Sequence, residues 1–177
     1  MGKIFLISGG CRSGKSKFAL DLAAPYKKPF YLATAQIYDD EMEARVERHK
    51  EERNNRFQTI EEPYDVLSQI QNLQNADLLL WDCLTLWLSN LLCRNEAPSD
   101  ILEKLDHIVQ TLKTTSYDSI IVTNEVGMGV VPESKLGRQF RDLTGFAHQM
   151  ISPIANDVFL VSMGIPLSLK KLGFGHA

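Results

Sequence analysis

A glycine-rich segment that ends in lysine and serine is the strongest chemical signal in the 177-residue sequence. It fits the pattern G-x-x-x-x-G-K-[ST], whose backbone N–H groups can surround phosphate oxygens. The segment consists of Gly9, Gly10, Cys11, Arg12, Ser13, Gly14, Lys15 and Ser16. An apolar run precedes it and a helical pattern follows, so that helix would point its positive end at the same phosphates. We expect Lys15 to reach the β- and γ-phosphates of a nucleotide and Ser16 to hold Mg²⁺.

An acidic residue at the end of a buried strand is the best partner for this motif. Residues 78–82 form such a strand, and Asp82 at its end occupies the position from which a Walker B aspartate binds Mg²⁺. Ligands of open α/β sheets lie at the carboxyl ends of the strands. Three other predicted strand ends therefore compete for substrate contacts, at residues 34–36, 124–125 and 162–163.

Residues 39–53 form a highly charged helical pattern with an unusual inner face. Most such runs are solvated surface helices with i,i+4 ion pairs. Here Met42, Val46, His49 and Arg53 fall on one face at i, i+4, i+7 and i+11. The imidazole thus shares a face with the only large apolar residues of the segment. An inward histidine is more often structural than catalytic, so the pattern alone leaves both roles open.

A loop and two arginines follow another predicted strand. Residues 124–133 contain two glycines and a proline, which predicts a shaped loop at the rim of the site. Arg138 and Arg141 are i,i+3 neighbours on the next predicted helix. They form either a phosphate clamp or a pair of surface arginines, and the pattern favours neither.

The elements that must position these residues alternate along the chain. Strand-like runs occur at 4–8, 30–33, 78–82, 119–123 and 158–163, and several are apolar throughout, as in a parallel sheet buried on both faces. Helical stripes occupy 101–112, after a capping signal at Asp100 and Glu103, and 136–150. A short final strand is expected within 164–170, on a sheet edge. Alternating strands and helices predict an α/β doubly wound fold, with residues 1–177 as one domain.

Composition narrows the class of protein. Hydrophobic residues make up 44% and charged residues 23%, as in globular proteins. The net charge of −3 provides no electrostatic footprint for nucleic acid, so we expect no nucleic-acid partner. No leader is visible and no apolar run approaches ~18 residues, so we expect no membrane anchor. Cys11, Cys83 and Cys93 lack metal or redox spacing and are interpreted as reduced thiols packed as small hydrophobes in a cytoplasmic protein.

The motifs, taken in order, resemble one family over nearly the whole chain. They are the segment 9–16, Ala33-Thr34-Ala35-Gln36, residues 39–42 with Arg45 and His49, Asp82-Cys83-Leu84-Thr85 with residues 90–92, residues 124–132, Gly137-Arg138, Phe140-Arg141-Asp142 and Gly145. In these segments the sequence is similar to the bifunctional adenosylcobinamide kinase/adenosylcobinamide-phosphate guanylyltransferase family of cobalamin biosynthesis. The central and C-terminal motifs are specific to that family.

The resemblance implies a RecA-like P-loop fold, a homotrimer and two reactions. The hydroxyl of adenosylcobinamide takes the γ-phosphate of ATP or GTP, and GMP from GTP is then joined to that phosphate, which gives adenosylcobinamide-GDP and pyrophosphate. The second step runs through a GMP-histidine intermediate, and the matching residue is His49. The implied nucleotide contacts are the P-loop residues 9–16, Thr34, Ala35, Gln36, Lys50, Glu51, Glu52, Arg53, Glu61 and Asp82.

Several points stay open at the level of sequence. His148 stands where relatives usually have asparagine, so any role of that amide is in doubt. No unambiguous base for the kinase step is evident, and Asp82 and Glu125 are the candidates. The alternatives to the bifunctional enzyme are a plain P-loop small-molecule kinase with His49 as a bystander, and a non-catalytic RecA-like nucleotide switch.

Overall fold

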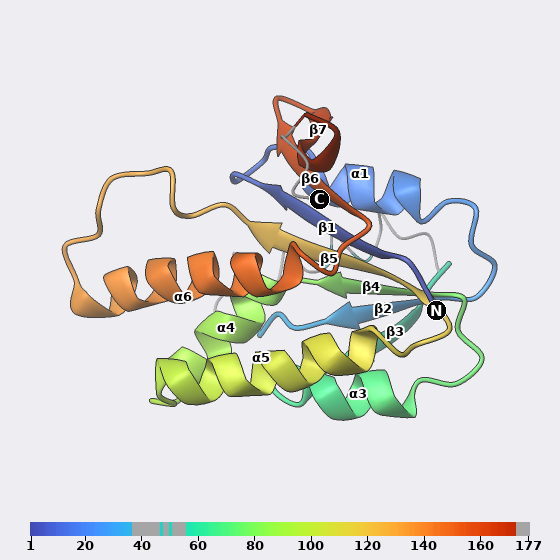
Figure 1. Ribbon diagram of the computed structural model, residues 1–177, viewed down its shortest axis with the longest axis horizontal. Coiled ribbons are helices and arrows are strands. Elements are labelled where there is room, and N and C mark those ends of the chain that lie inside the picture. The colour runs from blue at the N-terminus through green and yellow to red at the C-terminus, as the bar shows by residue number, and fades with distance from the viewer. Residues whose placement is uncertain (37–46, 48–49, 51–55, 173–177) are drawn as a thin grey trace.

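The computed structural model describes residues 1–36, 47, 50 and 56–172, which form one seven-stranded sheet flanked by helices (Figure 1). The strand order is β3-β2-β4-β5-β1-β6-β7, and all pairs are parallel except β6–β7. The strands are β1 Ile4–Gly9, β2 Pro29–Ala33, β3 Gln58–Glu61, β4 Leu78–Asp82, β5 Asp118–Asn124, β6 Asp157–Ser162 and β7 Ile165–Ser168. The helices are α1 Lys15–Leu22, α3 Val66–Asn72, α4 Leu84–Cys93, α5 Pro98–Leu112, α6 Lys135–Ile151 and α7 Leu169–Leu172.

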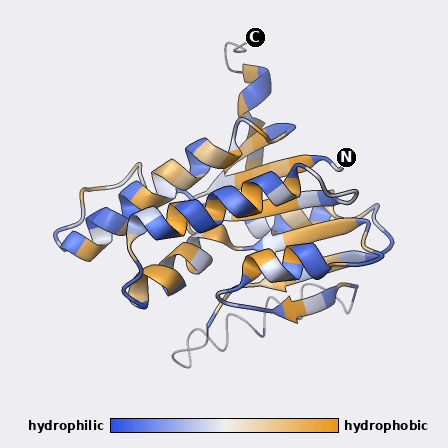
Figure 2. Cartoon of the chain, turned by 60° about the horizontal axis from the view of Figure 1, so that its bottom comes forward, coloured by the Kyte–Doolittle hydropathy of each residue, from blue (hydrophilic) through white to orange (hydrophobic). Residues whose placement is uncertain are grey.

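Helices cover both faces of the sheet. In Figure 1, α1 lies on one face, and α3, α4, α5 and α6 lie on the other. Each face has its own buried apolar cluster: Ile7, Leu80 and Val122 belong to the α1 side, and Leu6, Trp81 and Ile121 to the other. Figure 2 shows the hydrophobic strands beneath helices that carry hydrophilic residues on their visible faces. Alternate residues of each central strand are therefore buried in opposite layers, which is why these strands are apolar throughout.

The predicted α/β P-loop fold is confirmed. The glycine-rich segment joins β1 to α1, and one strand, β5, separates β1 from β4, which is the arrangement of RecA-like proteins. All five predicted strands are present, and β7 is an antiparallel edge strand as expected. Within the described part of the chain, no helix has the length and hydropathy to span a bilayer.

Some predicted details were wrong. The helix expected after Asp100 begins earlier: Ala97 is its N-cap, Pro98 occupies the first turn, and Asp100 lies within that turn. Proline fits there because its missing N–H would have no partner within the helix. Of the three cysteines, Cys83 is buried as expected, whereas Cys11 and Cys93 are exposed.

The register of the strands brings their carboxyl ends to one edge of the sheet. Gly9 of β1 pairs with Asn124 of β5, and Ala33 of β2 pairs with Asp82 of β4. We call this the carboxyl edge. The segments that follow β1, β2, β4 and β5 therefore meet there, and these segments contain most of the predicted site residues.

Candidate functional site at the carboxyl edge

The P-loop is held in a compact shape by its own backbone and by the turn after β6. Arg12 and Gly14 have positive φ angles of 55° and 94°, and the N–H of Ser13 donates to Gly10 O at 3.3 Å. The N–H of Gly164, in the β6–β7 turn, donates to Ser13 O at 2.9 Å. A Cβ at Gly14 would lie 3.1 Å from Gly164 Cα. Glycine is required at this position both for its backbone angles and for the close approach of the two segments.

Lys15 is buried and directed back over the loop. Its exposed fraction is 8%, and its Nζ donates to Gly10 O at 3.2 Å. A lysine ammonium held over a loop of backbone N–H groups is the arrangement that binds the charge of a polyphosphate. Ser16 follows on the first turn of α1, a turn that contains no acidic residue to oppose an anion.

Asp82 ends β4 and has a hydrogen-bond partner that sequence reasoning missed. The hydroxyl of Tyr31, on the neighbouring strand β2, donates to Asp82 Oδ2 at 2.6 Å. Only β5 lies between β4 and the P-loop strand, so Asp82 is about 10 Å from β1 along the edge. The remaining carboxylate oxygen and the Ser16 hydroxyl are hard donors of the kind that suits Mg²⁺. In the described ranges, no group of three or more His, Cys, Asp or Glu side chains could hold a metal ion, so a bound Mg²⁺ would also need phosphate and water ligands.

Hydrogen bonds to neighbouring elements hold the segment 34–36, which follows β2. Thr34 is fully buried: its hydroxyl bonds to both the carbonyl and the N–H of Cys83, at 2.8 and 2.9 Å. Asn90 of α4 donates to Thr34 O at 2.8 Å, and Gln36 Nε2 donates to the Tyr64 hydroxyl at 2.6 Å. Thr34 therefore anchors the segment to Cys83, the residue that follows β4. Burial raises the pKa of Cys83 to about 11, so this thiol stays protonated at neutral pH.

Lys50 and Glu61 lie together at the far end of the carboxyl edge. Lys50 Nζ is 3.5 Å from Glu61 Oε1 and 3.2 Å from Glu47 Oε1. The hydrogen bond to Glu47 and the charge of Glu61 raise the pKa of Lys50, so its ammonium is charged at neutral pH. The structure thus brings together two of the predicted nucleotide contacts. The predictions for His49, Glu51, Glu52 and Arg53, and for the inner face of residues 39–53, lie outside the described residues.

The two arginines of α6 each have a local partner. Arg138 donates to the carbonyls of Pro132 and Glu133, at 3.1 and 2.6 Å, and so closes the loop that precedes the helix. Arg141 donates from Nη2 to Asp142 Oδ1 at 2.8 Å. These contacts favour the structural interpretation of the pair over the phosphate clamp.

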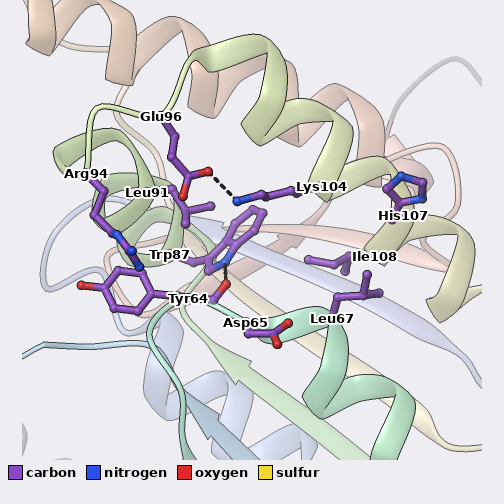
Figure 3. A pocket seen from close by; sticks show the side chains of 10 residues that line it. All are labelled: Tyr64, Asp65, Leu67, Trp87, Leu91, Arg94, Glu96, Lys104, His107 and Ile108. Carbon is purple, nitrogen blue, oxygen red and sulfur yellow. Dashed lines mark hydrogen bonds and ion pairs between the residues drawn. The ribbon is translucent and has the colours of Figure 1, made fainter.

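A separate hollow of about 370 Å³ lies between α3, α4 and α5 (Figure 3). Tyr64 is on its rim, with the Arg94 guanidinium 4.4 Å from the ring centroid, and Trp87 Nε1 donates to Tyr64 O at 2.7 Å. None of the predicted site residues lines this hollow. Tyr64 lines the hollow, and its hydroxyl accepts a hydrogen bond from Gln36 of the predicted site.

Tyr31, Tyr64 and Asn90 support the site and were not predicted to do so. The role of Asn90 could have been suspected from the sequence, because this residue interrupts the apolar run of α4 and a buried amide needs hydrogen-bond partners. No sequence pattern pointed to Tyr31 or Tyr64, since a tyrosine in or after a strand is compatible with ordinary packing.

The solved structures to which the chain is similar are distant. The chain is 16% identical to the RadB recombinase, with a TM-score of 0.49 over 90% of this chain and 74% of that one. It is 8% identical to the VirB11 ATPase of the Brucella suis type IV secretion system, with a TM-score of 0.43 over 89% of this chain and 43% of that one.

Sequence relatives are more similar and match over most of the chain. The chain is 35% identical to the bifunctional adenosylcobalamin biosynthesis protein CobU of Escherichia coli K12, over 94% of this chain and 99% of that protein. It is 38% identical to the bifunctional adenosylcobalamin biosynthesis protein CobP of Pseudomonas aeruginosa, over 93% and 96%. The model of the cobinamide kinase / cobinamide phosphate guanyltransferase family matches residues 5–169. The chain therefore belongs to this family.

Proposed function

We propose that this protein carries out both reactions of its family: it phosphorylates adenosylcobinamide with ATP or GTP and then transfers GMP from GTP to the product. The observation that carries the proposal is the P-loop, with the Lys15 ammonium folded over Gly10, in a chain that the family model matches over residues 5–169. A polyphosphate on this loop would meet Lys15, the loop N–H groups and the positive end of α1. The implied products are adenosylcobinamide-GDP and pyrophosphate.

The kinase half-reaction uses the P-loop end of the edge. Residues 9–16 bind the nucleotide phosphates, with Thr34, Ala35, Gln36 and Asp82 beside them. Catalysis of phosphoryl transfer rests mainly on positioning and on neutralising charge. Ser16 and Asp82 would hold Mg²⁺, which supplies further neutralisation of the phosphate charge when it is bound.

The guanylyltransferase half-reaction uses His49 as nucleophile. A neutral imidazole, with a reference pKa near ~6.5, is competent at neutral pH. Its attack on the α-phosphorus of GTP forms an N–P bond and releases pyrophosphate, and the cobinamide phosphate oxygen then displaces the histidine. Lys50, Glu51, Glu52, Arg53 and Glu61 are the proposed nucleotide contacts for this step. The pairing of Lys50 with Glu61 supports the grouping of these residues.

We further propose that residues 1–177 act as one catalytic domain in a cytoplasmic homotrimer. Exposed apolar side chains of β7 and α7 support self-association, since Ile165 is 61% exposed and Leu172 is 69% exposed. Three free cysteines fit a reducing compartment. The net charge of −3 favours small-molecule substrates over nucleic acid as partners.

A product assay tests the proposal. The protein is incubated with adenosylcobinamide, Mg²⁺ and GTP that carries isotope at either the γ- or the α-phosphate, and corrinoids are separated by chromatography. We expect γ-label in adenosylcobinamide phosphate and α-label in adenosylcobinamide-GDP. A plain kinase would give only the first product, and a nucleotide switch would give neither.

A further inference from the structure

Glu125 lies beside the P-loop strand at the carboxyl edge. It follows Asn124, the last residue of β5, and its N–H donates to the carbonyl of Gly9 at 3.0 Å. Gly9 is the first residue of the P-loop, so the backbone of Glu125 is hydrogen-bonded to the phosphate-binding segment itself.

Among the residues that the structure describes, the other carboxylates at this edge are engaged or remote. Asp82 accepts from Tyr31 and is the proposed Mg²⁺ ligand, and a carboxylate bound to a metal is a poor proton acceptor. Glu62 accepts from the N–H groups of Tyr64 and Asp65, both at 2.9 Å. Glu61 ends β3, four strand positions from β1, which corresponds to about 19 Å. Within the described ranges, Glu125 is the acidic residue that directly follows a strand adjacent to β1.

The two oxygens of the Glu125 carboxylate have different surroundings. Gly127 N–H donates to Oε1 at 2.6 Å, whereas Oε2 lies 4.0 Å from His148 Nδ1 on α6. The side chain is 21% exposed. One oxygen is therefore fixed by the backbone, and the other faces an imidazole.

His148 is itself held in place by a buried threonine. Its Nε2 lies 2.9 Å from the hydroxyl oxygen of Thr123, which is fully buried. Thr123 and Glu125 are two residues apart, so their side chains leave the chain on the same side, toward α6. Burial lowers the pKa of His148, although the Glu125 charge opposes this effect, so the ring is neutral at neutral pH. If Thr123 donates to Nε2, the single N–H of the neutral ring is at Nδ1 and points toward Glu125.

We propose that Glu125 is the general base of the kinase half-reaction and that His148 is the residue that positions it. This inference rests on the proposed kinase function. The Glu125 carboxylate accepts the proton of the cobinamide hydroxyl as that oxygen bonds to the γ-phosphorus. The bond from this phosphorus to the β–γ bridging oxygen breaks, and its electron pair leaves with the nucleoside diphosphate.

Assaying the kinase and labelling reactions separately distinguishes a general base at Glu125 from a residue that only supports the fold. In Glu125→Gln we expect kcat for γ-phosphate transfer to adenosylcobinamide to fall about 10²-fold or more, because general-base catalysis typically contributes that much. Covalent labelling of the protein by α-labelled GTP, which needs no cobinamide hydroxyl, should be unchanged. Glu125→Asp keeps a carboxylate and should retain more kinase activity than Glu125→Gln. Glu133→Gln removes an exposed acid of the same loop and should match wild type.

His148 is tested by removal of its ring and by replacement with an amide. His148→Ala should lower the kinase kcat by about tenfold to hundredfold through misplacement of Glu125, with little change in the KM for nucleotide. His148→Asn should keep most of the kinase kcat that His148→Ala loses, since an amide can accept a hydrogen bond from Thr123 and donate one toward Glu125.

The outcomes separate failure of this inference from failure of the proposed function. The assignment of Glu125 is overturned if Glu125→Gln keeps wild-type kinase activity, or if it loses kinase activity and protein labelling together. Equal kinase rates in wild type and His148→Ala would remove the positioning role. If wild type itself transfers no γ-phosphate to adenosylcobinamide, the proposed kinase function fails, and this inference fails with it.

Discussion

The environment of Lys15 suits a side chain that binds an anion. A buried ammonium is costly unless it has partners, and Lys15 is 8% exposed with the Gly10 carbonyl as one acceptor. A polyphosphate would supply a far stronger acceptor in the same place. Lys17, two residues further on, is exposed and pairs with Asp21 instead. The two lysines thus differ in environment although they share a helix.

Replacing Lys15 should therefore weaken nucleotide binding. Loss of a charge-assisted hydrogen bond costs about 1.5–3 kcal/mol, so Lys15→Ala should raise the Kd for GTP by about tenfold to hundredfold. Isothermal titration calorimetry measures the change, with Lys17→Ala as the matched control. A Kd in Lys15→Ala equal to that of the control would contradict the assignment.

His148 makes a contribution to stability that depends on pH. Its folded-state pKa is lowered by burial, so between that pKa and the ordinary value near ~6.5 the unfolded chain binds more protons. The stabilisation is complete above about pH 6.5 and is lost as the pH falls through the folded-state pKa. Urea unfolding across this range should show a shallower loss of stability in His148→Asn than in wild type. Parallel pH profiles would contradict a neutral, buried imidazole.

At the level of elements, local signals predicted the buried strands and the short edge strand β7 but missed β3. The apolar strands β1, β4 and β5 were predicted because the burial of both faces leaves a continuous apolar run. β3 contains one apolar residue, Ile60, and lies at the sheet edge, so hydrophobicity gave no sign of it. The apolar run of α4 cannot be distinguished from a strand by periodicity alone.

In the site as well, sequence reveals residues with a local pattern and misses residues whose partners are distant in the chain. The P-loop and Asp82 could be proposed from sequence because each has a local pattern of residue types. The supporting residues Tyr31, Asn90 and Tyr64 act across the sheet or between elements, and only the fold brings them to their partners. Sequence left Asp82 and Glu125 as candidates for the kinase base, and our proposal of Glu125 depends on contacts that only the fold reveals.

The packing of β1 against β6 makes a prediction about Gly9. A Cβ at this position would lie 2.5 Å from both the Val161 carbonyl oxygen and Ser13 Oγ. The Val161 contact is with backbone of the paired strand, which cannot move aside cheaply. Gly9→Ala should therefore lower the free energy of unfolding by about 1–3 kcal/mol. Gly129→Ala, where no atom lies within 4 Å of the added carbon, is the control for urea unfolding. Equal stability of the two variants would show that the strands can separate there.

At the scale of the whole molecule, exposed apolar residues gather on the β7 edge of the sheet. Ile165 and Leu167 of β7 are 61% and 42% exposed, and Leu169 of α7 is 43% exposed. An edge strand with free backbone groups and apolar side chains is a common site of association between chains. This edge is opposite the β3 edge, where Lys50 and Glu61 lie, so association through β7 would leave that part of the site open.

The proposed homotrimer can be tested by mass. Light scattering should give about 60 kDa, three times the chain mass of 20.0 kDa. Replacing Ile165 and Leu167 together by aspartate should yield monomers, because buried unpaired carboxylates would oppose association. Gln110→Asp on exposed α5 should remain trimeric. A wild-type mass of one chain would contradict the proposal.

The covalent intermediate on His49 is the central claim about how this protein works, and isotope labelling tests it most directly. Wild type, His49→Ala and the control His107→Ala, an exposed histidine of α5, are incubated with GTP labelled at the α- or the γ-phosphate. We predict protein-bound label from α-labelled GTP only, labile to acid and stable to base, present in wild type and His107→Ala and absent from His49→Ala. Absence of covalent label in wild type that still binds GTP would contradict the account and leave a plain kinase or a nucleotide switch.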